Sequence, residues 1–425
     1  MIARGRAWAL ALVSASMVAC AHGAGTTVAV APEPPGPNDP PTREVIDRWD
    51  RAAAIFARLD AAGTWDGEAC REALAAFEAV NEASGGRSAR AVYMAGLISV
   101  RCSNDAGAQA LYRRALELDP SLCEARVGLG AAELSAGRGE AARQAFEEAV
   151  RRDNQCAPAY VNLAILQGEI PEQREAALAN LRRALAVRAD YLPALDRMAL
   201  IYLAQAEERP ELLELAEVVC RQAQLIDPDY ASLYNTWGLI DVEQGELTSA
   251  AAKFARATEL DDRFFEAHMN FGQITLSQRA YADAARAFAR ARELSPSSYD
   301  AALGLGVASR GLRDPERAEA MYRAALALDA ARPEAYFDLA VLYQEHREGS
   351  AAELRQALDF LGQFVERARG ADRFASTLRE VTRWCAEPRR ARRAPACASG
   401  RAQNIVTALG ILDPEQAPAR PDWTR

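Results

Sequence analysis

Cysteine is the residue type in this chain with the clearest potential for covalent chemistry. The chain of 425 residues holds eight: Cys20, Cys70, Cys102, Cys123, Cys156, Cys220, Cys385 and Cys397. A structural metal site usually draws its thiolates from close pairs of the Cys-x-x-Cys type, and no such pair occurs here. The cysteines could instead form disulfides. Which of them can pair depends on the helices that carry them, because the two Cα atoms must lie close together.

Residues that could perform acid–base or nucleophilic catalysis form no motif. The three histidines, His22, His268 and His346, are widely separated, and no HExxH, GxSxG or P-loop pattern is present. The glycine pairs at 128/130 and 304/306 have the form of fragments of a nucleotide-binding loop, but they lie inside predicted helices with no preceding strand. We interpret them as packing positions, and we predict a protein that is not an enzyme and holds no cofactor or metal.

A repeat of about 34 residues runs through most of the chain. We number its eight copies as repeats 1 to 8; repeats 3, 4 and 8 need one, five and five extra residues, respectively, between positions 8 and 20. The repeats begin at Ala89, Cys123, Ala157, Leu192, Ala231, Phe265, Tyr299 and Pro333. A fixed period of this length predicts stacked supersecondary units rather than one closed core.

Three positions of the repeat predict that each copy is a pair of packed helices. Position 8 holds Gly96, Gly130, Ala164, Ala199, Gly238, Gly272, Gly306 and Ala340. Position 20 holds Ala108, Ala142, Ala177, Ala216, Ala250, Ala284, Ala318 and Ala357. Position 24 holds Tyr112, Phe146, Leu181, Cys220, Phe254, Phe288, Tyr322 and Leu361. Small residues at 8 and 20 allow two helices to cross closely, at about 8–10 Å, and the side chain at 24 shares a face with position 20.

These positions resemble the pattern of the tetratricopeptide repeat family over roughly two thirds of the chain, residues 89–366. The resemblance implies an all-α fold: a right-handed superhelix of helix–turn–helix units, with a concave groove lined by the first helices. Residues 43–88 are predicted to form a helix pair that caps the array, and residues 367–425 a C-terminal helical extension and tail.

The N-terminus has the features of a targeting segment. Residues 1–19 combine the basic Arg4 and Arg6 with an apolar run that is too short to span a bilayer. The sequence from Met17 to Cys20 resembles a bacterial lipobox, with methionine where leucine is usual, and this resemblance implies lipidation of Cys20. Ala21 follows where enteric bacteria use aspartate to retain a lipoprotein in the inner membrane, which favours the outer membrane. The proline-rich residues 20–42 are then a tether.

The phase of the repeat predicts how the other cysteines pair. Cys70 lies near the start of a second helix and Cys102 at the end of the next first helix, so the two ends should meet. Cys123 at position 1 and Cys156 at position 34 should lie at the same edge of adjacent repeats. We therefore predict disulfides Cys70–Cys102 and Cys123–Cys156. A third, Cys385–Cys397, would close a short loop beyond the repeats. Cys220 occupies position 24 and is interpreted as a buried hydrophobic residue. The alternative is free cysteines in a reducing compartment.

Positions 2, 5, 6, 9, 12 and 13 of each repeat should face the groove. The candidate binding residues there are Arg90, Tyr93, Arg101, Asn162, Arg197, Asn235, Asn270, Gln273, Arg310 and Asp338, with Asp196 and Thr236 beside them. Amide side chains can pair with both the N–H and the C=O of an extended peptide. A hydrophilic groove with no particular ligand is the competing interpretation. The net charge of −9 argues against nucleic acid as a partner.

Together these features predict a lipid-anchored scaffold on the periplasmic side of the outer membrane that docks proteins of an envelope complex. The order of lipobox, tether, long array and cysteine-bearing extension resembles the tetratricopeptide lipoproteins of the adventurous gliding machinery of myxobacteria. Pilotin-like lipoproteins that assemble a pilus secretin share the lipobox and repeats, although they have fewer repeats and no extension. An adaptor for cell-wall hydrolases or proteases is a third hypothesis.

Overall fold

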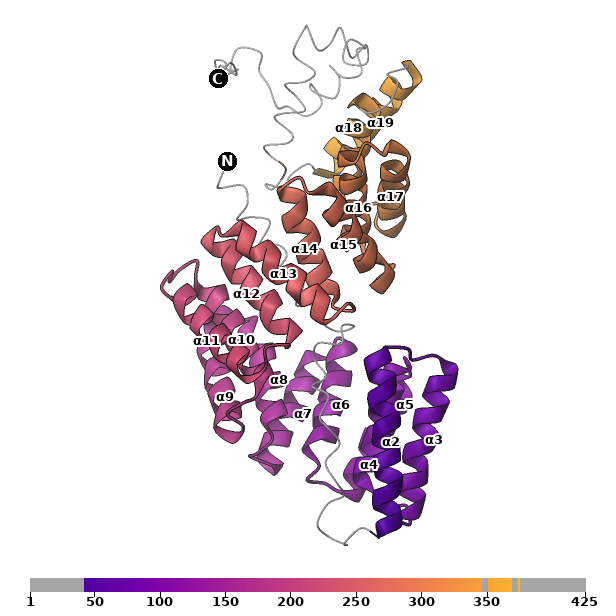
Figure 1. The fold of residues 1–425 in the computed structure, drawn as a ribbon, viewed down its shortest axis with the longest axis vertical. Coiled ribbons are helices and arrows are strands. Elements are labelled where there is room, and N and C mark those ends of the chain that lie inside the picture. Colours follow the sequence, from indigo (N-terminus) through magenta and orange to yellow (C-terminus); the bar gives the residue numbers. More distant parts are fainter. Residues whose placement is uncertain (1–41, 346–350, 369–373, 375–425) are drawn as a thin grey trace. The chain divides into compact units, whose positions relative to one another are not determined.

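Antiparallel α-helix pairs build the part of the chain that the computed structural model describes, which comprises residues 42–345, 351–368 and 374 (Figure 1). No strand occurs among these residues. The chain divides into two bodies, one ending at Leu260 and the other beginning at Asp261, which we call the N-terminal and C-terminal bodies.

The N-terminal body begins with the cap helices α2 (Arg43–Ala62) and α3 (Gly67–Ala83). Its repeats follow as α4 (Ala89–Arg101), α5 (Asp105–Leu118), α6 (Cys123–Ser135), α7 (Gly139–Arg152), α8 (Ala157–Gly168), the 3-10 turn η1 (Pro171–Gln173), α9 (Arg174–Val187), α10 (Leu192–Gln205), α11 (Leu212–Ile226), α12 (Ala231–Gln244) and α13 (Leu247–Leu260). The C-terminal body contains α14 (Phe265–Ser277), α15 (Tyr281–Leu294), α16 (Tyr299–Gly311), α17 (Pro315–Leu328), α18 (Glu334–Glu345) and α19 (Ala351–Ala368).

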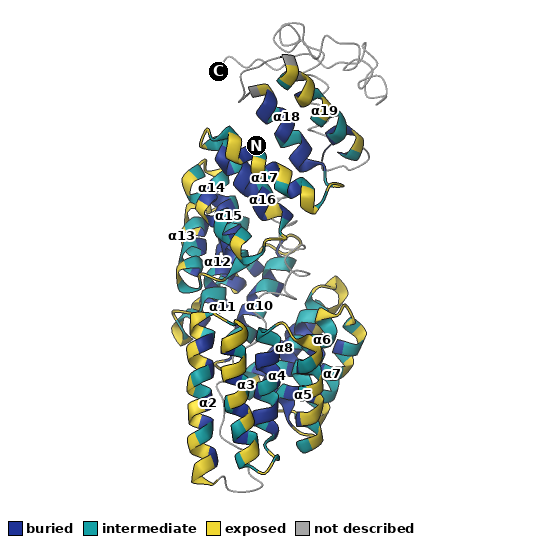
Figure 2. Ribbon diagram, turned by 90° about the vertical axis from the view of Figure 1, so that its right-hand side faces the viewer, coloured by how far each residue is buried: buried dark blue, intermediate teal, exposed yellow. Residues whose placement is uncertain are grey.

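The helix bounds follow the repeat that is visible in the sequence. Seven first helices begin at position 1 of their repeat, and α18 begins one residue after Pro333. Helices α5, α11 and α15 end one residue before an Asp-Pro or Ser-Pro pair, because proline disfavours helix at the residue that precedes it. The cap helix α2 has one buried side, formed by Trp49 and Phe56 among others, and an exposed side (Figure 2).

In repeats 1, 2, 5, 6 and 7, which we call regular, an aromatic ring of the second helix packs against a glycine of the first helix. Tyr112 and Phe288 at position 24 are almost fully buried. A Cβ atom added to the position-8 glycine of the same repeat would lie 2.6 Å from the Tyr112 ring at Gly96, and 2.8 Å from the Phe288 ring at Gly272. Any side chain larger than hydrogen would therefore push the ring out of the crossing.

The residue types at positions 8 and 24 vary together across the repeats. Glycine faces an aromatic ring in repeats 1, 2, 5, 6 and 7. Alanine occupies position 8 in repeats 3, 4 and 8, where position 24 is Leu181, Cys220 or Leu361. Alanine with leucine in repeats 3 and 8 thus keeps the combined side-chain volume close to that of glycine with an aromatic residue, as a close-packed crossing requires, whereas Ala199 with Cys220 in repeat 4 is a smaller pair.

The glycine pairs at 128/130 and 304/306 have the packing role that we predicted. A Cβ atom added to Gly128 would lie 2.8 Å from the Tyr112 ring of the preceding repeat, and one added to Gly304 would lie 2.7 Å from the Phe288 ring. Each of these two rings is therefore held between a glycine of its own repeat and a glycine of the next, which is how neighbouring repeats stack.

Two disulfides join neighbouring helices of the N-terminal body. The Cα atoms of Cys70 and Cys102 are 6.1 Å apart, and those of Cys123 and Cys156 are 5.8 Å apart. These are the two pairs that the repeat phase predicts; the third predicted pair, Cys385–Cys397, and the lipidation candidate Cys20 lie outside the described residues. Cys220 is buried and unpaired by disulfide.

The turn between the two helices of a regular repeat passes through the left-handed region at position 15. Gly137 and Gly245 adopt positive φ there, as do Ser103, Arg279 and Arg313, with φ of 56°, 62° and 64°. A residue with a Cβ atom is strained in this region by about 1–2 kcal/mol, so three repeats keep a turn that glycine would form at lower cost.

Exchanging glycine for alanine under a ring tests the crossing. We expect Gly130→Ala to lower the free energy of unfolding by about 1–3 kcal/mol, because the new methyl group overlaps the buried Phe146 ring. Adding Phe146→Leu should recover part of this loss, since alanine with leucine is the pair found in repeat 3. Urea unfolding of both single variants and the double variant gives the coupling energy.

The control for this cycle is Gly139→Ala in the same repeat, where no atom lies within 4 Å of the added carbon. We expect it to leave the free energy of unfolding unchanged or to raise it by up to about 1 kcal/mol, because alanine lowers the entropy of the unfolded chain. A cycle with no coupling between residues 130 and 146 would contradict our account of the crossing.

Relieving the strained turn should stabilise the C-terminal body. Arg279→Gly removes the Cβ strain at φ 62° while raising the entropy of the unfolded chain, and we expect a net gain of about 0.5–1 kcal/mol. Thermal unfolding followed by circular dichroism measures the gain. Arg286→Gly, an exposed change in the interior of α15, is the matched control and should lose about 1 kcal/mol instead.

Candidate functional site

The first helices of successive repeats lie side by side within each body. Helix α8 contacts α6 and α10, and α10 also contacts α12; in the C-terminal body α16 contacts α14 and α18. We call the side of these helices that carries positions 2, 5, 6, 9, 12 and 13 the first-helix face. Of the ten predicted binding residues, Arg90, Tyr93, Arg101, Asn162, Arg197 and Asn235 belong to the N-terminal body, and Asn270, Gln273, Arg310 and Asp338 to the C-terminal body.

A buried carboxylate organises the N-terminal first-helix face. Asp196 on α10 is only 4% exposed, and its two oxygens accept hydrogen bonds from Thr236 Oγ1 at 2.5 Å and Ser232 Oγ at 3.1 Å. Both donors come from α12, so this network ties two consecutive repeats together. Buried carboxylates need such donors to offset their loss of hydration. Asp196 and Thr236 therefore hold the face in place rather than reach out from it.

The single lysine of the chain closes a second polar contact in this body. Lys253 on α13 forms an ion pair with the buried Asp241 of α12 and donates a hydrogen bond to Ser249 Oγ at 2.9 Å. Its Nζ also lies 4.6 Å from the centre of the Trp237 ring, within range of a cation–π contact. The sequence did not single out Lys253 as a functional residue, and its contacts are those of a structural residue.

Several predicted binding residues take part in contacts within the N-terminal body. Arg101 Nε lies 3.0 Å from Asp60 Oδ1, so its charge is shared with the cap helix α2. Asn162 Nδ2 donates to the carbonyl oxygen of Pro158, at 2.8 Å in its own helix. Arg90 and Arg197 are half-buried on α4 and α10, and Asn235 is buried on α12.

Tyr93 is the aromatic member of this set. Its ring lies 5.7 Å from the ring of Tyr112, the side chain that closes repeat 1. Burial raises the pKa of the Tyr93 phenol well above its ordinary value, and the neighbouring Tyr112 acts in the same direction. The phenol therefore stays neutral at physiological pH and can act as a hydrogen-bond donor.

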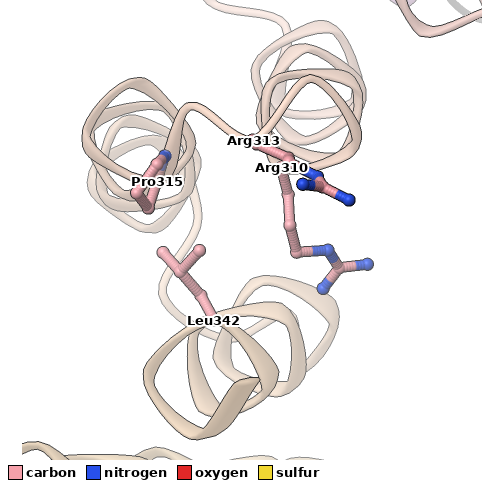
Figure 3. A pocket seen from close by; sticks show the side chains of 4 residues that line it. All are labelled: Arg310, Arg313, Pro315 and Leu342. Carbon is pink, nitrogen blue, oxygen red and sulfur yellow. The ribbon is translucent and has the colours of Figure 1, made fainter. Parts of the chain in front are cut away.

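In the C-terminal body two predicted residues meet directly. Arg310 Nη1 of α16 lies 2.9 Å from Asp338 Oδ1 of α18. Burial raises the pKa of Asp338, and Arg310 opposes that shift by favouring the charged carboxylate. Beside them is a shallow hollow lined by Arg310, Arg313, Pro315 and Leu342 (Figure 3). Asn270 and Gln273 are half-buried on α14.

His268 on α14 is a buried histidine in a helical repeat position. Its Nε2 lies 3.0 Å from the carbonyl oxygen of Asp262, so the neutral ring carries its proton on Nε2. Burial lowers the pKa of His268, while the Asp262 carbonyl and carboxylate oppose this shift. The Asp262 carbonyl oxygen satisfies the buried ring nitrogen, so the geometry is that of a core residue.

Two features are absent from the described residues. These residues contain no cluster of three histidine, cysteine or carboxylate side chains that could hold a metal ion. None of their helices is both long enough and apolar enough to cross a membrane.

The fold and this face define a helical-repeat protein whose paired helices present polar residues on one side. A family model described as tetratricopeptide repeat matches residues 104–157, 235–299 and 272–333. The helix pairs within these ranges therefore match the tetratricopeptide repeat, and the described residues have that repeat fold. No curated protein matches the chain.

Similar solved structures also belong to this fold. The chain is similar to Cut9–Hcn1 of the APC/C hetero-tetramer, with 15% identity and a TM-score of 0.51 over 69% of this chain and 55% of that one. It is similar to YrrB, a TPR protein with an unusual peptide-binding site, with 24% identity and a TM-score of 0.34 over 45% of this chain and 96% of that one. It is similar to PilF of Pseudomonas aeruginosa, with 20% identity and a TM-score of 0.43 over 54% and 99%. The chain thus spans about half the length of the Cut9–Hcn1 chain, and at these identities the likeness concerns the fold alone.

The buried histidine should make stability depend on pH. Because the pKa of His268 is lower in the folded protein than the ordinary 6.5, the unfolded chain takes up its proton more readily. Stability is then fully present above pH 6.5 and declines as the pH falls from 6.5 towards the folded pKa, by at most about 1.4 kcal/mol per pH unit. Urea unfolding at pH 7.5, 6.5 and 5.5 measures this slope.

The variant His268→Gln should flatten the slope between pH 7.5 and 5.5. His346→Gln, at a residue outside the described ranges, serves as the control. If both variants retain the slope of the wild-type protein, His268 is not its source.

Proposed function

We propose that this protein is a non-catalytic scaffold of the bacterial envelope that binds partner proteins through its first-helix face. In this proposal Cys20 carries a lipid that anchors the chain to the periplasmic side of the outer membrane. The partners are proteins of an envelope complex, and nucleic acid is not among them. The observation on which the binding role depends is the polar first-helix face.

The geometry of the N-terminal first-helix face supports this role. The hydrogen bonds from Ser232 and Thr236 to Asp196 fix α12 against α10. Arg197 and Asn235, which flank Asp196 and Thr236 in the sequence, are thereby carried on a rigid support. A preformed surface loses little conformational entropy when a peptide or domain docks on it, so more of the contact energy appears as affinity.

The two disulfides support a location outside the cytoplasm. Disulfides persist in oxidising compartments such as the periplasm and are rare in the bacterial cytoplasm. The pairs Cys70–Cys102 and Cys123–Cys156 lie in the cap and the first repeats, the part of the array nearest in sequence to the proposed lipid anchor. Cys70–Cys102 joins α3 to the end of α4, and Cys123–Cys156 joins the start of α6 to the start of α8.

The particular complex that we propose is a gliding-motility machine. The order of lipobox, proline-rich tether, repeat array and cysteine-bearing extension resembles the tetratricopeptide lipoproteins of that machinery. Deleting the gene should then abolish single-cell gliding. Normal gliding with altered cell shape or pilus number would instead favour the cell-wall adaptor or the pilotin-like role.

In-cell crosslinking of the tagged mature protein tests the scaffold. We expect motility-complex or outer-membrane barrel proteins to co-purify, and Arg197→Glu on the first-helix face to reduce their recovery at least fivefold. Arg182→Glu, an exposed change on the second helix α9 of the preceding repeat, is the matched control. Equal recovery with Arg197→Glu and wild type would exclude this part of the face, and a secretin or a hydrolase as the main product would replace the motility assignment.

The lipid anchor needs its own measurement. Cys20→Ser should release the protein from the membrane fraction into the soluble periplasmic fraction. Continued membrane association of this variant would contradict anchoring through Cys20, without bearing on what the repeats bind.

A further inference from the structure

Helix α11, the second helix of repeat 4, presents large apolar side chains to solvent. Leu215 is 41% exposed, Val218 is 54% exposed and Leu225 is 89% exposed. They lie three and seven residues apart, a spacing that keeps them on one side of a helix. The opposite side of α11 is buried through Ala216, Cys220 and the residues around them. We call the row of Leu215, Val218 and Leu225 the outer ridge.

The other repeats show that the fold does not require these residues. The outer ridge occupies positions 19, 22 and 29 of the repeat. In the other seven repeats, these positions hold only glycine, alanine, serine, glutamine or a charged residue. Their helices pack in the same way without large apolar side chains there, so stability of the repeat does not explain the outer ridge. An exposed apolar row of this kind is typical of an interaction surface.

The charges around the outer ridge indicate what it would bind. Between residues 207 and 229 the chain has seven carboxylates and two arginines, a local net charge of −5. Glu207, Glu208, Glu211 and Glu214 are exposed at the N-terminal end of α11. Asp227 and Asp229 follow its C-terminal end, where Arg256 pairs with Asp229. The apolar row therefore has acidic groups at both of its ends.

This arrangement discriminates between occupants. Two copies of α11 packed together, parallel or antiparallel, would place acidic ends against acidic ends, which disfavours a second copy of this chain. An anionic membrane surface is disfavoured for the same reason. A helix with an apolar stripe and basic flanks satisfies both the ridge and the carboxylates.

We propose that the outer ridge of α11 docks an amphipathic helix with basic flanks from a partner protein. This site is separate from the first-helix face, because it lies on the solvent-facing side of a second helix. The protein would then hold two partners at once, one on each kind of helix. The proposal does not depend on which partner occupies the first-helix face.

A designed peptide tests the recognition directly. The probe is a fluorescein-labelled helix of about 18 residues in which leucine forms one stripe and lysine the flanks, a length of about five turns. We expect it to bind the full-length protein in an anisotropy titration, and the triple variant Leu215→Ala/Val218→Ala/Leu225→Ala to bind at least tenfold more weakly. This variant keeps every charge and uses the residue most common at these positions in the other repeats. The variant Leu312→Ala/Leu328→Ala, which removes two exposed leucines of the C-terminal body, should bind as the wild type does.

The charge requirement is tested with two further samples. A peptide with glutamate in place of lysine should bind at least tenfold more weakly than the lysine peptide. Glu211→Gln/Glu214→Gln should weaken binding of the lysine peptide and reduce its dependence on salt. If the triple alanine variant binds the lysine peptide within twofold of the wild type, general attraction to an acidic protein explains the binding and the proposal is wrong.

Crosslinking in cells distinguishes the occupants. A photo-crosslinking residue at position 218 should capture a basic amphipathic segment of another protein, whereas the same residue at the exposed Gln144, position 22 of repeat 2, should not. Capture of a second copy of this chain, together with a dimer in sedimentation that the triple variant abolishes, would overturn the proposal in favour of self-association. Capture of lipid alone would overturn it in favour of a membrane contact.

Discussion

The contact between positions 8 and 24 at each helix crossing, a glycine under an aromatic ring in five of the eight repeats, is the constraint on which the array depends. The ring at position 24 fills the space between two helices only when position 8 has no side chain, as at Gly96 under Tyr112 and Gly306 under Tyr322. Where the ring is replaced by Leu181 or Leu361, alanine at position 8 makes up for the lost volume. Gly128 brings repeat 2 onto the Tyr112 ring, and Gly304 brings repeat 7 onto the Phe288 ring, so at these two junctions one ring sets both the helix pair and the stacking of pairs.

Packing of this kind leaves the sides of the helices free to vary, which is how a uniform scaffold carries specific surfaces. On the first helices, polar residues are fixed by their neighbours across repeats, as Asp196 is by Ser232 and Thr236. On the second helices, charged and small residues occupy the positions of the outer ridge except in repeat 4. The small residues at the helix crossings are thus common to all copies, whereas the residue types on the exposed sides differ from repeat to repeat.

Repeats 3, 4 and 8 depart from the regular pattern. They contain the extra loop residues, they use alanine rather than glycine at position 8, and none of them has an aromatic residue at position 24. The buried carboxylate Asp196 and the outer ridge of α11 both lie in repeat 4. Repeat 4 therefore combines a change in packing and loop length with a change in its exposed surface.

The sequence by itself determined the elements of this protein, because a 34-residue period constrains every crossing residue in the same way. The starts of the first helices, the role of the glycine pairs and the pairs Cys70–Cys102 and Cys123–Cys156 follow from the phase of that period. Only the tertiary structure decided how polar residues on the first-helix face are used. Arg101 pairs with Asp60, 41 positions earlier, and Asp196 accepts hydrogen bonds from donors 36 and 40 positions later. A repeat phase gives the side of the helix on which such a residue lies, but the partner depends on side-chain reach between different repeats, which no single position of the pattern encodes.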